Sequence, residues 1–84
     1  MNKKTVAVIG ANGQIGTQVV KKLIDNKNFK PVAVVRSKLA ASILKKKINK
    51  KFEIRVGDLL VDKNKQILED CEYVINSSLS VGNT

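Results

Sequence analysis

The stretch "VAVIGANGQIGTQVVKKLI", from Val6 to Ile24, contains three of the five glycines of this 84-residue chain. Gly10, Gly13 and Gly16 follow an apolar run of the kind found in strands that are covered on both faces. The apolar side chains that come after the first two glycines recur at the spacing of one helix face. These side chains are Ile15, Val19, Val20, Leu23 and Ile24. The stretch therefore predicts a buried strand, a glycine-rich turn and an amphipathic helix.

A tight turn from a parallel strand into a helix leaves unpaired N–H groups at the helix start, which attract phosphate together with the helix dipole. We expect Gly10 to make the turn, Gly13 to admit a pyrophosphate close to the backbone, and Gly16 to let the helix pack on the sheet. Asn12 and Gln14 would add side-chain donors at the same rim. The spacing is G-x-x-G-x-x-G, and a strand before it and a helix after it are the context that a dinucleotide-binding turn requires. A glycine-rich turn without a ligand is the alternative.

The rest of the chain continues the alternation of strands and helices. The predicted strands are Thr5–Ile9, Pro31–Val35, Phe52–Val56 and Glu72–Asn76. A second helix carries an apolar stripe at Ala40, Ile43, Leu44 and Ile48, and a shorter third helix is expected within Lys63–Asp70. Such alternation predicts an α/β fold with a parallel, doubly wound sheet and right-handed crossovers.

The end of the second predicted strand, "VVRSK", indicates which dinucleotide would fit. An acid at this point binds the ribose 2′-hydroxyl of NAD, whereas an arginine accommodates the 2′-phosphate of NADP. Arg36 stands in the place of the acid, and a guanidinium can hold a phosphate through two parallel hydrogen bonds. Ser37 adds a hydroxyl and Lys38 a second cation. The sequence therefore favours NADP; the alternative for Arg36 is a solvated surface charge.

The third predicted strand ends in "VGDLL", which places a short acid at the same rim of the sheet. Asp58 could accept a hydrogen bond from the adenine amino group, with the backbone of Leu59 beside it. The alternative is that Asp58 is a turn or N-cap residue for the segment that follows.

Composition narrows the function classes. The net charge of +9 would suit binding to nucleic acid. The chain has only three aromatic residues on which bases could stack, however, so nucleic-acid binding is disfavoured. One cysteine and no histidine disfavour a zinc site, so no metal is predicted. No apolar run reaches the length of a membrane span. A single cysteine, Cys71, suits a reducing cytoplasm, which is the expected location.

The stretches "VAVIGANGQIGTQVV", "VAVVRS" and "VGDL", in this order, resemble the extended and atypical short-chain dehydrogenase/reductases, in particular their NmrA-like, NAD(P)H-binding branch. The resemblance implies a Rossmann fold of strand order 3-2-1-4, with NADP across the carboxyl ends of the strands. It also implies a set of cofactor contacts. Gly10, Asn12, Gly13, Gln14 and Ile15 would line the pyrophosphate beside Gly16, Arg36 with Ser37 the 2′-phosphate, Asp58 and Leu59 the adenine, and Asn76, Ser77 and Ser78 the adenosine ribose.

The family's catalytic Tyr-x-x-x-Lys pair would come after the last residue of this chain, and Tyr73 is followed four positions later by Ser77. No catalytic residue is therefore predicted, and residues 1–84 are interpreted as the N-terminal portion of an NAD(P)-binding Rossmann domain. Its fourth strand would be an uncovered edge, which invites homo-oligomerisation. A stand-alone NAD(P)-sensing module of NmrA-like type is the alternative function. A ligand-sensing domain of an ion-transport regulator shares the glycine turn, but Arg36 counts against it.

Overall fold

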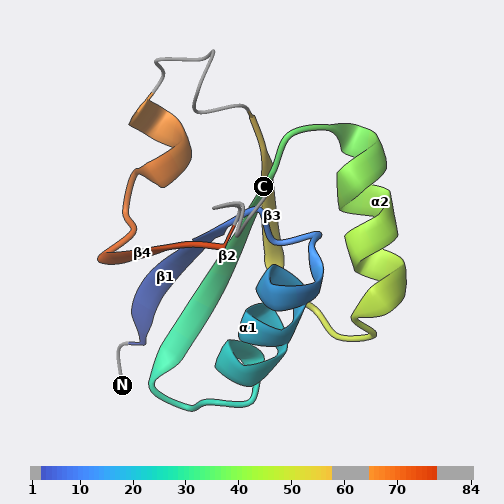
Figure 1. The fold of residues 1–84 in the computed structure, drawn as a ribbon. Helices are drawn as coiled ribbons and strands as arrows, with labels where there is room; N and C mark the ends of the chain where they lie inside the picture. The colour runs from blue at the N-terminus through green and yellow to red at the C-terminus, as the bar shows by residue number, and fades with distance from the viewer. Residues whose placement is uncertain (1–2, 58–64, 78–84) are drawn as a thin grey trace.

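Strands and helices alternate along the chain, as Figure 1 shows for this computed structural model, which describes residues 3–57 and 65–77. The strands are β1 (Lys4–Ile9), β2 (Phe29–Val35), β3 (Glu53–Val56) and β4 (Tyr73–Asn76). The helices are α1 (Gln14–Ile24), α2 (Lys38–Lys47) and the short 3-10 helix η1 (Lys65–Leu68). No described helix is both long enough and apolar enough to span a membrane.

The four strands form one parallel sheet in the order β3-β2-β1-β4. This confirms the predicted partial Rossmann arrangement, with β3 and β4 at the two edges. Ile9 at the end of β1 is in register with Val34 on β2 and with Asn76 on β4. The carboxyl ends of three strands therefore stand level, and the segments that follow them emerge at one edge of the sheet.

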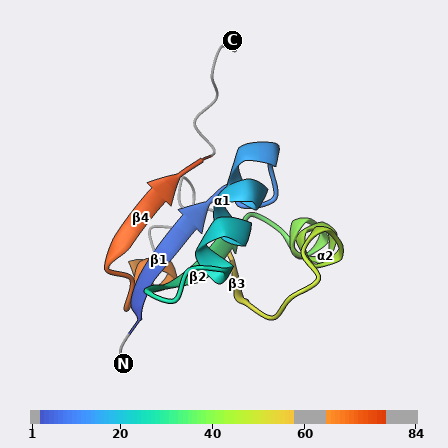
Figure 2. The same ribbon diagram turned by 90° about the horizontal axis from the view of Figure 1, so that it is seen from below.

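The helices lie on both faces of the sheet. Figure 2 shows α1 and α2 together on one face, while η1 packs on the other. The core under α1 and α2 is made of Val8, Ala11, Val20, Ala33, Val35, Ala41, Leu44 and Ile48. The opposite face buries Ala7, Val32 and Val34 beneath Ile67 and Leu68. Both faces of β1 and β2 are therefore covered, which explains their continuous apolar runs.

Two residues assigned to the apolar helix faces are exposed instead. Ile15 is 62% exposed because it lies in the first turn of α1, at the edge of the sheet where the strands have ended. Ile43 is 41% exposed, since α2 packs through Ala41, Leu44 and Ile48 and leaves Ile43 at the margin of the contact. The helical stripes were thus predicted in the main, but their limits were wrong.

The element bounds differ slightly from the prediction. β2 begins at Phe29, so Pro31 lies inside the strand and not at its first residue. The proline is tolerated because β3 joins β2 only from Val32 onward, and no ladder bond is lost on that side. Of the third helix expected within Lys63–Asp70, the described residues form the 3-10 helix η1, which ends at Leu68, while residues 63 and 64 lie outside them.

Candidate functional site at the glycine loop

The glycine loop, residues 10–13, turns the chain sharply from β1 into α1. Gly10 has φ 75°, in the left-handed region that favours glycine. The turn is closed by the N–H of Gly13, which donates to the Gly10 carbonyl at 3.1 Å. The N–H of Gly10 donates to the Val34 carbonyl at 3.1 Å, so the loop is also attached to the end of β2.

The start of α1 presents free donors to solvent. Gly13 is the N-cap and provides no side-chain cap, and the first turn contains no acidic residue. Within the described residues, the N–H groups of Gln14, Ile15 and Gly16 have no acceptor. Three such donors at the positive end of a helix are a site for an anion, and phosphate oxygens fit them.

The carbonyl groups of the loop are, by contrast, occupied by donors of the protein itself. The Gly10 carbonyl accepts from the Gly13 N–H and lies 3.3 Å from the Ser77 hydroxyl, which also donates to the Ile9 carbonyl just before the loop at 2.6 Å. Thr17 in α1 donates twice, from its hydroxyl to the Ala11 carbonyl at 3.0 Å and from its N–H to the Gly13 carbonyl at 2.9 Å. Of the three residues whose N–H groups have no acceptor within the described residues, Gln14 and Ile15 are exposed, whereas Gly16 is buried.

Gly16 allows α1 to approach the loop. A Cβ atom at this position would overlap the Gly10 carbonyl oxygen and would come within 2.6 Å of the Ser77 hydroxyl and 2.7 Å of the Ala11 Cα. Gly16 therefore has the packing role expected from the sequence. By contrast, a Cβ on Gly13 would meet only the Gly10 carbonyl oxygen, at an ordinary 3.5 Å.

Arg36 and Ser37 follow β2 at the same edge of the sheet. Arg36 is exposed and makes no hydrogen bond or ion pair within the described part of the chain. The Ser37 hydroxyl accepts a hydrogen bond from the N–H of Ala40 at 3.1 Å and caps the start of α2. Ser37 thus caps a helix, a structural role that the sequence analysis did not predict. Arg36 has no such role within the described residues and is available to a ligand.

The structure brings most of the predicted site residues together at the carboxyl edge of the sheet. The glycine loop with the first turn of α1, the pair Arg36–Ser37, and Ser77 all lie there. Asp58, Leu59 and Ser78 lie outside the described residues. Among the described residues, no group of three or more His, Cys, Asp or Glu side chains could hold a metal ion.

Two residues that hold the loop, Thr17 and Lys47, were missed in the sequence. Thr17 is 5% exposed and is a small polar residue within an apolar helix face, which is the one signal that pointed to it. The Lys47 ammonium donates to the Asn12 carbonyl at 3.2 Å across 35 positions of sequence, and no local pattern could have predicted this contact.

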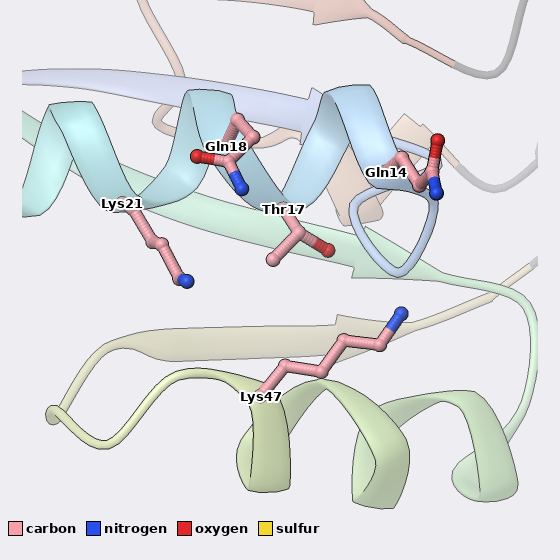
Figure 3. A pocket seen from close by; sticks show the side chains of 5 residues that line it. All are labelled: Gln14, Thr17, Gln18, Lys21 and Lys47. Carbon is pink, nitrogen blue, oxygen red and sulfur yellow. The ribbon is translucent and has the colours of Figure 1, made fainter.

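A groove of about 440 Å³ lies between α1 and α2, beside the loop. Figure 3 shows the side chains that line it, with Lys47 stretching from α2 toward the start of α1. The lining residues are Gln14, Thr17, Gln18, Lys21 and Lys47. The groove is polar and carries two cations, so it extends the electropositive region that begins at the helix start.

The sequence profile of a family described as NAD(P)H-binding matches residues 10–84. The chain belongs to this NAD(P)H-binding family. The match begins at the first glycine of the loop, so the start of α1 lies within the matched residues. Comparison with curated protein sequences gives no significant match.

Solved structures share the fold. UDP-glucuronic acid 4-epimerase from Bacillus cereus, in complex with UDP-glucuronic acid and NAD, superposes with a TM-score of 0.67 at 21% identity. A second structure of this epimerase, with NAD, gives a TM-score of 0.66 at 21% identity. In each case the match covers 87% of this chain but 26% of the epimerase chain. The NAD(P)H-binding chain described here therefore spans about a quarter of the epimerase's length.

Proposed function

We propose that this chain is an NADP(H)-preferring dinucleotide-binding unit of a short-chain-dehydrogenase-type oxidoreductase, without catalytic activity on its own. The observation that carries the proposal is the combination of three free N–H groups at the start of α1 with an unpartnered Arg36 at the same edge. The first feature suits the pyrophosphate of any dinucleotide. The second suits the 2′-phosphate that only NADP carries.

The chain's own residues would divide the work of binding. The N–H groups of Gln14, Ile15 and Gly16 would hold the pyrophosphate, with Gly13 leaving room for its approach. Arg36 would hold the 2′-phosphate. The lone pairs of the Ser77 hydroxyl remain able to accept a hydrogen bond from the ribose. When bound, the dinucleotide supplies or accepts a hydride, while these residues bind and orient it.

We further propose that residues 1–84 correspond to the N-terminal portion of an NAD(P)-binding Rossmann domain of NmrA-like type. The match to 26% of the epimerase chain supports the assignment to a portion of a longer domain, and the sequence resemblance supports the NmrA-like type. Residues 1–84 contain no Tyr-x-x-x-Lys pair. A stand-alone NAD(P)-sensing module, which would use the same binding residues, is the second candidate function. The free Cys71 supports a cytoplasmic location.

The test is calorimetric titration of the 84-residue chain with NADPH and NADH. We expect the chain to bind NADPH more tightly than NADH. Arg36→Ala should lower the affinity for NADPH by about 10- to 100-fold, the loss expected for a hydrogen bond to a charged group. The affinity for NADH should change little. Lys45→Ala, which removes an exposed charge on α2, is the control. Equal losses for both dinucleotides would exclude Arg36 as the 2′-phosphate ligand.

Gly13→Val tests the pyrophosphate site separately. A branched side chain would stand in the path of the pyrophosphate, so neither dinucleotide should bind. Circular dichroism shows whether the variant is folded. A folded wild-type chain that binds neither dinucleotide would contradict the proposed function.

A further inference from the structure

Lys47 connects α2 to the glycine loop. It lies in the last turn of α2, and its ammonium donates to the Asn12 carbonyl at 3.2 Å, 35 positions earlier in the chain. Figure 3 shows the side chain extended along the groove toward the first turn of α1. Its neighbours Lys45 and Lys46 are exposed and make no hydrogen bond or ion pair within the described residues.

The bond from Lys47 holds the Asn12 carbonyl, the one loop carbonyl that accepts a hydrogen bond from α2 within the described residues. The Gly10 carbonyl accepts from the Gly13 N–H at 3.1 Å and from the Ser77 hydroxyl at 3.3 Å. The carbonyls of Ala11 and Gly13 accept hydrogen bonds from Thr17 of α1. The peptide that joins Asn12 to Gly13 is held at one end by its N–H, which donates to Gly10. Lys47 holds the other end, so this peptide plane is fixed from both sides.

This peptide precedes a glycine, so little in the local backbone restrains it. Rotation of its plane changes the φ of the following residue, and at Gly13 no Cβ limits that angle. Gly13 is the N-cap of α1. A rotation of this peptide plane that is not compensated elsewhere therefore changes how the chain enters the helix. It also changes the orientation of the free N–H groups of Gln14 and Ile15.

We propose that Lys47 is a positioning residue for dinucleotide binding, which keeps the glycine loop in its binding conformation by donating to the Asn12 carbonyl. The inference rests on the proposed function and adds a contact from α2, outside the glycine motif. Because Lys47 acts through the loop, it supports the pyrophosphate that NAD and NADP share. Loss of the Lys47 ammonium lowers the affinity for both dinucleotides by the same factor, whereas loss of Arg36 lowers the affinity for NADP alone.

The first experiment compares Lys47→Met with Lys46→Met. Both variants remove one positive charge from the same turn of α2, but only the first removes the bond to Asn12. In calorimetric titrations, Lys47→Met should weaken NADPH and NADH alike by about three- to tenfold, the effect of one exposed hydrogen bond. Lys46→Met should bind as the wild type does. Lys47→Arg should restore binding, since a guanidinium can donate to the same carbonyl.

The second experiment needs no dinucleotide. Hydrogen exchange of the Gly13 amide, measured by NMR on the ligand-free chain, reports whether its bond to Gly10 is maintained. The exchange should be about three- to tenfold faster in Lys47→Met than in the wild type or Lys46→Met. If the wild type binds neither dinucleotide, the proposed function fails, but this measurement still tests whether Lys47 orders the loop.

Two results would overturn the inference. In one, Lys47→Met matches Lys46→Met in dinucleotide affinity or in Gly13 exchange, so that the bond to Asn12 does not order the site. In the other, the loss is confined to NADPH, which would mean that the ammonium contacts the 2′-phosphate directly. Thermal unfolding of each variant establishes that the folded chain is being compared.

Discussion

Gly16 lacks a Cβ, and both the glycine loop and the packing of α1 on the sheet depend on that absence. The positions that a Cβ would occupy are taken by the Gly10 carbonyl oxygen, the Ser77 hydroxyl and the Ala11 backbone. Two of these atoms belong to the backbone of the glycine loop and the third to the residue after β4. A rotation of the Ser77 side chain would therefore leave the two backbone overlaps in place. A methyl group at 16 would push α1 away from the strands.

We therefore predict that Gly16→Ala destabilises the chain by about 1–3 kcal/mol, the usual cost of overpacking. Helix propensity alone would predict the opposite result, because alanine is about 1 kcal/mol more favourable than glycine within a helix. A loss of stability would therefore come from the overlap. Urea or thermal unfolding followed by circular dichroism measures the change in the free energy of unfolding. Gly13→Ala is the control: its φ of −77° suits alanine and its Cβ has room, so its expected cost is limited to the poorer N-cap propensity of alanine. Equal stability of the two variants would show that the loop yields more easily than its backbone contacts indicate.

At the scale of elements, one arginine attaches the crossover between β3 and β4 to the sheet. Arg55 on β3 donates from Nη1 to the carbonyls of Ile67 and Glu69 at 2.8 and 2.9 Å, and so holds the end of η1. Its Nε donates to the Glu53 carboxylate at 2.7 Å. Among the described residues, the side chains of Ile67, Leu68 and Cys71 pack on this sheet face, so this polar contact supplements a small apolar one.

Arg55→Met should lower the free energy of unfolding by about 1–3 kcal/mol, because two carbonyls lose a charged donor. Exchange of the amides in β4 should rise with it, since η1 leads directly into that strand. Lys45→Met, on the exposed side of α2, removes the same charge and should change neither quantity. An unchanged midpoint in Arg55→Met would show that η1 is held by its apolar contacts alone.

The same contact predicts a pH dependence. The hydrogen bond from Arg55 holds the pKa of Glu53 below its ordinary value, although burial opposes the shift. A lowered pKa in the folded state contributes stability above the ordinary carboxyl pKa, and that contribution is lost as the pH falls through the folded value. The thermal unfolding midpoint, measured from neutral to acidic pH, should decrease once the pH falls below about 4. The decrease should be less steep in Glu53→Gln, which has no carboxylate at this position to protonate. Parallel curves for the two proteins would contradict the assignment.

At the scale of the whole molecule, β4 forms an edge of the sheet with apolar side chains in solvent. Within the described residues it pairs with β1 alone. Tyr73, Val74 and Ile75 are 48%, 49% and 38% exposed, whereas the corresponding positions of β1 and β2 are buried. A strand that is exposed on both faces and along one edge is prone to pair with another chain.

We propose that two copies of the chain associate through β4, and we predict dimers in sedimentation velocity as the protein concentration rises. The net charge of +9 opposes association, so added salt should strengthen it. Ile75→Lys should shift the population to monomer. Leu39→Lys, which alters a 71% exposed apolar residue on α2, should not. A monomer at all concentrations and salt levels would exclude pairing through this edge.

The sequence by itself determined the order of elements, the parallel sheet and the glycine loop. These features depend on local patterns: apolar runs for strands buried on both faces, helical spacing in between, and glycines at the turn. The edge position of β3 agrees with its sequence, in which Glu53 and Arg55 alternate with apolar residues. Arg36 could be placed at the end of β2 because the turn after a strand is local in the chain.

Only the tertiary structure decided which groups hold the loop and which remain free. Lys47 and Asn12 are far apart in the chain, as are Ser77 and Ile9, and no local pattern records such pairs. The exposure of Ile15 was likewise set by where α1 crosses the edge of the sheet. Helical periodicity fixes the direction of a side chain, but burial depends on what lies opposite, and that is a property of the packed fold.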